Sequence, residues 1–231
     1  MKLTKGGICV IAAFAAVFGA FSALATQIGQ GDFSSSATVI NFDNLAGGNS
    51  ISTGEIVTNQ YAAEGVIFND PNYPARANFS LSSQILTGHS QPNFLFVLQH
   101  DGGSGQPLQI LFTTAQTEVG FFFLTSTFSD IELTAYDAGN NVLEHDTAVG
   151  THLYTDQIQG FTGIFNSQGI MRLDVESHPT DPGYPLGLTY PLNFSIDDLT
   201  LQAAPEPSVL GLAGIGAAAL MILHRRKRNP S

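Results

Sequence analysis

The chain has 231 residues, of which 19 are Asp or Glu and only 8 are Lys or Arg, giving a formal net charge of −11 at pH 7. Six of the basic residues lie near the two ends, so that only Arg76 and Arg172 accompany eighteen acidic residues between positions 26 and 204. This central part of the chain, called the body below, has too few basic residues to neutralise phosphate groups. Its charge therefore excludes nucleic acid and an anionic membrane surface as direct partners.

The first 25 residues have the features of a signal peptide. Lys2 and Lys5 precede an apolar run over residues 8–24, and the run closes with an Ala-Leu-Ala triplet of the kind that signal peptidase recognises. We therefore expect cleavage after Ala25, the alternative being an uncleaved membrane helix. Because Cys9 would leave with the leader, the exported chain would have no disulfide and would depend on its core or on bound ions.

After a polar segment over residues 26–37, residues 38–202 carry the pattern of an all-β domain. Short runs rich in β-branched and aromatic residues alternate with clusters of Gly, Pro, Asn and Asp about every ten residues. We expect a single two-sheet antiparallel sandwich, most simply a jelly roll, flanked by two short apolar helices at the chain ends. The expected strands cover residues 38–42, 65–68, 94–98, 108–112, 119–124, 130–136, 141–144, 164–165, 170–175 and 194–201.

Two stretches of the body predict more specific features. Ile131, Leu133 and Ala135 alternate with polar residues, and the Gly- and Asn-containing segment 137–141 then predicts a hairpin turn before a return strand. The apolar run over residues 121–124 predicts a strand that is buried on both faces or that passes between the two sheets.

The first and last expected strands both run into acidic residues. Asp43-Asn44 follows the alternation of the first strand, Asp197-Asp198 interrupts that of the last, and the apolar phase slips by one residue after each pair. Such a slip is typical of a β-bulge, which redirects side chains. If the two strands pair antiparallel, their oxygen atoms meet at one edge and suit a structural Ca²⁺. The alternative is that these acids cap turns in solvent.

A near-repeat places a tyrosine in each of two expected loops. DPNYP at residues 70–74 recurs as DPGYP at residues 181–185. A loop aromatic held by a following proline is a platform for a sugar ring, with nearby polar side chains as hydroxyl partners. The alternative is that both tyrosines pack onto the sandwich. The candidate ligand-binding residues are Tyr73, Tyr184, Asp70, Asn72 and Asp181.

No catalytic set stands out, and we expect a protein that is not an enzyme. Ser104 lies in a Gly-rich stretch without the G-x-S-x-G pattern of a nucleophile elbow. His145, Asp146 and His152 lack the spacing of a zinc motif, and the body's histidines are expected on surface loops. With eighteen acids available, no particular pair is indicated for glycoside hydrolysis.

The C-terminal segment 203–231 combines three features. Pro205-Glu206-Pro207 precedes an apolar run over residues 209–223, whose fifteen positions span about 22 Å as a helix. A hydrocarbon core is about 30 Å thick, so the run is short for a permanent span. The basic cluster that follows would stay on the cytoplasmic side. Its members are Arg225, Arg226, Lys227 and Arg228. Both a weak anchor and a removable sorting tail fit this pattern.

Together these three features resemble the PEP-CTERM sorting signal of Gram-negative bacteria. The resemblance covers roughly the last 27 residues and implies processing by an exosortase after transient insertion in the inner membrane. It further implies that the mature protein is secreted or held at the cell surface, in association with extracellular polysaccharide. The body itself is similar, over short stretches only, to Ca²⁺-bearing jelly rolls of the carbohydrate-binding type.

These observations lead to one expected function and two alternatives. We expect an exported, non-catalytic component of the polysaccharide matrix, handled by signal peptidase and exosortase and stabilised by Ca²⁺. The first alternative is a lectin-like module that uses the two loop tyrosines. The second is a hydrolase that acts on polysaccharide.

Overall fold

The computed structural model describes residues 26–45, 48, 56–69, 90, 94–97, 107–126, 129–148, 150–154, 157–180 and 193–203. These residues confirm the expected all-β antiparallel architecture, whereas the apolar helices expected at the two ends lie outside them. No helix among them is long and apolar enough to cross a membrane.

The elements are β1 (Thr26–Gln27), η1 (Gln30–Asp32), β2 (Thr38–Ile40), η2 (Ala62–Glu64), β3 (Val66–Asn69), β4 (Leu95–Val97), β5 (Leu108–Ser126), β6 (Ser129–Tyr136), β7 (Val142–Thr147), β8 (Thr151–Tyr154), β9 (Gln157–Pro179) and β10 (Phe194–Ala203).

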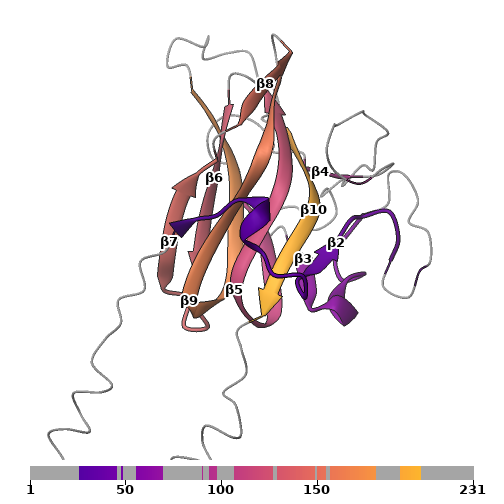
Figure 1. The fold of residues 1–231 in the computed structure, drawn as a ribbon, viewed down its shortest axis with the longest axis vertical. Coiled ribbons are helices and arrows are strands. Elements are labelled where there is room, and N and C mark those ends of the chain that lie inside the picture. Colours follow the sequence, from indigo (N-terminus) through magenta and orange to yellow (C-terminus); the bar gives the residue numbers. More distant parts are fainter. Residues whose placement is uncertain are drawn as a thin grey trace, which may run out of the picture.

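The two longest strands, β5 and β9, organise the sandwich (Figure 1). They pair antiparallel from Leu108↔Val175 to Ser126↔Gln157. At one end of this pair, β3 joins β5 while β6 and then β7 continue from β9. At the other end, β10 joins β5 and carries β2 and β4, while β1 and β8 join β9. The inward side chains of both halves belong to one hydrophobic cluster, which makes the arrangement a sandwich.

β5 and β9 each cover two of the strands expected from the sequence. The polar stretch between residues 112 and 119 interrupts the apolar alternation, but the chain stays extended there and only the register with β9 shifts. Gly169 lies opposite this shift with a φ of +92°, and a Cβ added to it would lie 2.9 Å from the Ala115 Cβ. Both the left-handed backbone and the close approach therefore require glycine at this position.

The hairpin expected after residue 136 is present between β6 and β7. Asp137 accepts hydrogen bonds at its Oδ1 from the backbone N–H of Asn141, at 2.8 Å, and at both carboxylate oxygens from the Asn141 side-chain amide. Asn140 adopts the left-handed conformation, with a φ of 65°. The hydrogen bonds from Asn141 hold the pKa of Asp137 below its ordinary value. This turn fixes the register that places β7 side chains beside those of β6.

Candidate functional site

Pairing of β2 with β10 brings together the two acidic clusters, Asp43-Asn44 and Asp197-Asp198. β2 and β10 are antiparallel, with Ile40 opposite Leu199 and Thr38 opposite Leu201. The residues after β2 therefore run alongside the Asp197-Asp198 pair of β10. We call this region the β2–β10 junction, and its members are Asn41, Phe42, Asp43, Ser90, Asp197 and Asp198.

The backbone of the β2–β10 junction is irregular on both strands. Phe42 has a φ of 56° and Asp198 has a φ of 45°. Residues other than glycine seldom adopt this left-handed backbone conformation. The register between β10 and β5 also shifts between Asp197 and Thr200, which agrees with the phase slip seen in the sequence. Backbone of this kind persists only where the surrounding structure enforces it, and it gathers at functional sites.

Packing of Phe42 explains part of this geometry. Its side chain is fully buried, with ring centroids 5.6 Å from Tyr61 and 5.8 Å from Phe68. The left-handed residue thus supplies an aromatic anchor to the core immediately before the polar Asp43. The Asp43 N–H donates to Asn41 Oδ1 at 3.2 Å, which closes a short turn around Phe42.

Asp197 is the most unusual carboxyl group of the β2–β10 junction. It is 0% exposed, and its Oδ1 accepts the backbone N–H of Asp198 at 2.8 Å. Both carboxylate oxygens lie 3.4 Å from Ser90 Oγ. The pKa of Asp197 is raised to about 8, first by burial and then by the nearby charges of Asp198 and Asp43, against the opposing effect of these hydrogen bonds. The site therefore stabilises either a proton or a cation at Asp197.

Ser90 joins the two strands and was not singled out from the sequence. Its N–H donates to Asp198 Oδ2 at 3.0 Å, and its Oγ lies 3.4 Å from the carbonyl oxygen of Asn41. Ser90 is 107 positions from Asp197, with no motif around it, so no sequence signal links the two. Asn44, the fourth residue expected here, has an exposed side chain.

The donor set of the β2–β10 junction consists only of oxygen atoms. It offers the carboxylates of Asp43, Asp197 and Asp198, the hydroxyl of Ser90 and a main-chain carbonyl, which is the chemistry that Ca²⁺ prefers. Within the described ranges, no group of three or more His, Cys, Asp and Glu side chains is arranged to hold a metal ion. A cation here would therefore draw on the hydroxyl, the carbonyl and water as well as on the carboxylates.

The remaining predicted site residues lie outside the part of the chain that the structure describes. They are the loop residues Asp70, Asn72, Tyr73, Asp181 and Tyr184, and the processing residues Ala25, Pro205, Glu206, Pro207, Arg225, Arg226, Lys227 and Arg228. Their roles stay predictions.

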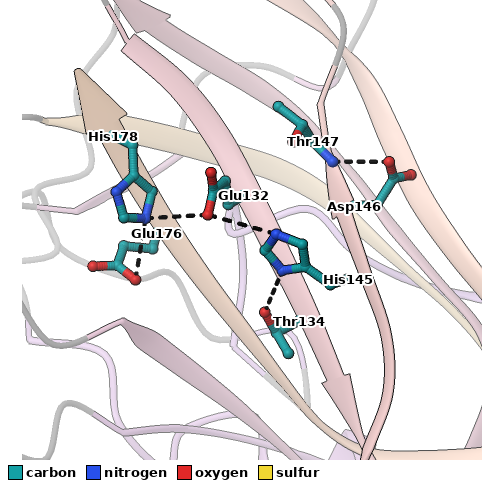
Figure 2. A network of polar contacts seen from close by, with 7 residues as sticks. All are labelled: Glu132, Thr134, His145, Asp146, Thr147, Glu176 and His178. Carbon is teal, nitrogen blue, oxygen red and sulfur yellow. Dashed lines mark hydrogen bonds and ion pairs between the residues drawn. The ribbon is translucent and has the colours of Figure 1, made fainter. Parts of the chain in front are cut away.

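A second polar cluster lies on the outward side of β6, β7 and β9 (Figure 2). Glu132 lies between His178 and His145, and Thr134 contacts the other ring nitrogen of His145. The expectation that the body's histidines lie on loops is wrong for these two, because His145 is in β7 and His178 is in β9. We call this cluster the histidine face, and its members are Glu132, Thr134, His145, Glu176 and His178.

Comparison with known proteins gives a limited result. No family model matches the chain, and no curated protein matches it. Among solved structures, the crystal structure of a DUF4465 family protein from Bacteroides caccae ATCC 43185 is similar, with a TM-score of 0.40 and 16% sequence identity. The similarity covers 60% of this chain and 73% of that chain.

Proposed function

We propose that this chain is an exported, non-catalytic β-sandwich protein of the extracellular polysaccharide matrix, and that Ca²⁺ bound at the β2–β10 junction stabilises it. The observation that carries the Ca²⁺ part is the convergence of Asp197 and Asp198 on Ser90, with Asp197 fully buried and the charge of Asp43 close enough to raise its pKa. The export part is supported by the signal peptide features of residues 1–25 and by the PEP-CTERM-like segment 203–231.

The position of the site favours a structural ion over a catalytic one. Asp197 lies within the sheet, where β10 pairs with β5, and solvent does not reach its carboxyl group. A bound Ca²⁺ would offset two of the three carboxylate charges and hold β2 against β10, in a chain that would have no disulfide once the leader is removed. The role of the ion is then to secure the pairing of the two strands.

Thermal unfolding tests the Ca²⁺ proposal. We expect the melting temperature of the purified protein to fall on treatment with EDTA and to recover on addition of Ca²⁺, because an ion that binds only the folded state stabilises it. A melting curve that responds to neither treatment would contradict the proposal.

Processing in cells tests the export proposal separately. We expect a tag placed within the body to appear outside the inner membrane, and a tag placed after Arg228 to be lost from the mature protein. Replacing Pro205-Glu206-Pro207 with three alanines should leave the second tag attached. Persistence of the full-length chain in the inner membrane of cells with a working exosortase would exclude this route.

A further inference from the structure

The histidine face gathers four potential metal ligands from three neighbouring strands. β6 alternates buried and outward residues, and Glu132 is one of the outward ones. In the strand register, Glu132 is opposite Glu176 of β9, and Thr134 is opposite His145 of β7. Asp130, the next outward residue of β6, is opposite His178. The sheet register therefore holds two imidazoles and two carboxylates on one surface.

Three of the six separations among these four side chains are close to those expected of ligands around one small ion. His178 Nε2 lies 3.3 Å from Glu132 Oε2 and 3.3 Å from Glu176 Oε2, and His145 Nε2 lies 3.7 Å from Glu132 Oε2 (Figure 2). Ligand atoms around a tetrahedral zinc ion are about 3.3 Å apart, as follows from bond lengths of about 2.0–2.1 Å. Two of the separations already agree, and the third exceeds this value by a few tenths of an ångström.

The negative charges on this surface also favour binding of a cation. Glu132 and Glu176 are direct cross-strand partners, an arrangement in which like charges destabilise a sheet. Arg172 is the only Lys or Arg in the described part of the chain. Its Nε lies 2.8 Å from Asp174 Oδ1, and its guanidinium carbon lies 3.7 Å from the centre of the Tyr136 ring. Arg172 is therefore engaged elsewhere and does not offset the charges of Glu132 and Glu176.

Thr134 is placed to orient one of the imidazoles. His145 Nδ1 lies 2.9 Å from Thr134 Oγ1. With the hydroxyl as acceptor, the proton of the neutral ring is on Nδ1, and the lone pair of Nε2 faces Glu132. Metal-bound histidines use their second nitrogen in this way, because the outer hydrogen bond fixes both the tautomer and the ring orientation.

We propose that Glu132, His145, Glu176 and His178 form a binding site for a divalent transition metal ion of the Zn²⁺ or Cu²⁺ type. The mixed nitrogen and oxygen ligands select such ions over Ca²⁺ and Mg²⁺, which prefer oxygen alone. The four side chains are not yet arranged around a common point. Closure requires His145 Nε2 to move closer to Glu132 while its Nδ1 keeps the contact with Thr134, and the 55% exposed side chain has room for this shift. This site is independent of Ca²⁺ at the β2–β10 junction.

Titration of the purified protein with Zn²⁺ in saturating Ca²⁺ tests the proposal. We expect one Zn²⁺ per chain at this site, and we expect His145→Ala and His178→Ala each to weaken its binding by about tenfold or more. His152→Ala provides a control, because His152 lies on β8, which pairs with β9 near Gln157, whereas His178 is near the opposite end of β9. This control should bind Zn²⁺ as tightly as the unaltered protein.

Three outcomes would contradict the proposed metal site. They are the absence of Zn²⁺ binding by the unaltered protein, an undiminished affinity in the His145→Ala/His178→Ala double variant, and a loss in His152→Ala as large as in the other two. Because the two histidine side chains are 55% and 40% exposed, the variants should keep their metal-free melting temperature. This measurement separates loss of a ligand from loss of the fold.

Discussion

The β2–β10 junction and the histidine face both concentrate acidic side chains, but they do so in opposite physical settings. At the β2–β10 junction Asp197 is fully buried, the polar donor atoms are all oxygen, and Phe42 and Asp198 have left-handed backbone conformations. The histidine face lies on regular strands, is partly open to solvent and mixes imidazoles with carboxylates. Burial makes charge costly at the first site, whereas solvent screens it at the second. Substitutions at the β2–β10 junction should therefore change stability, and those on the histidine face should mainly change metal binding.

The largest expected difference is in the response to Ca²⁺. Asp197→Asn should abolish the stabilisation of the protein by Ca²⁺, because it removes the buried carboxylate. In the unaltered protein, a free Ca²⁺ concentration about a thousandfold above Kd contributes about 4 kcal/mol, or roughly 10 °C in Tm. Calorimetry with and without Ca²⁺ measures this gain. Asp130→Asn, an exposed acid of β6, is the control and should keep the full gain.

The second prediction concerns pH in the absence of Ca²⁺. The folded state keeps the proton of Asp197 up to about pH 8, whereas the unfolded chain releases it near 3.8, so unfolding releases a proton between these values. Stability should therefore fall as the pH rises, by up to about 1.4 kcal/mol per pH unit between pH 5 and 7. Urea unfolding at several pH values measures the slope. Asp197→Asn should flatten this slope, and an equal slope in the variant would show that Asp197 is not its source.

The third prediction tests the strained backbone of the β2–β10 junction. Asp198→Ala should lose about 1 kcal/mol more stability than Asp198→Asn in Ca²⁺-free solution, because asparagine tolerates the left-handed conformation and alanine does not. Both variants remove the same charge, but only asparagine can keep an acceptor for the Ser90 N–H, so the difference measures the backbone conformation together with this hydrogen bond. Chemical denaturation of the two variants measures the difference, and equal stabilities would mean that the φ of 45° costs nothing here.

The smallest effect is expected on the histidine face. At pH 8 without metal, Glu132→Gln should change stability by only a few tenths of a kcal/mol, in the stabilising direction, because it removes the repulsion between two opposed glutamates. Denaturant unfolding measures this change. A loss of several kcal/mol would show that Glu132 is a structural residue and would remove the contrast between the two regions.

Strand positions could be predicted because they depend on local patterns, whereas the meeting of the acidic clusters followed only on the condition that the first and last expected strands pair antiparallel. The alternation around Ile131 and Leu133 fixed the β6–β7 hairpin, and the one-residue slip after Asp197 marked the register shift on β10. The histidine face could not be predicted in this way. His178 reaches Glu132 only through the register of β6 on β9, which depends on packing of the whole sheet.

Ser90 illustrates the same limit at the β2–β10 junction. The sequence indicated the carboxylates because each lies next to a recognisable strand. The hydroxyl and N–H that link Asp197 and Asp198 come from Ser90, which is distant in the sequence and belongs to none of the described strands. Contacts of this kind depend on how a connecting segment folds back, and no periodicity encodes that.

The continuity of β5 and β9 through both halves of the sandwich has a consequence for degradation. Neither half can detach while the other remains intact, because separation would break the same two strands in the middle. Amide protons in β6 and in β10 should therefore exchange through one shared global opening event. A protease would then find few partly opened forms to cut, and the lifetime of the protein would follow its total free energy of unfolding.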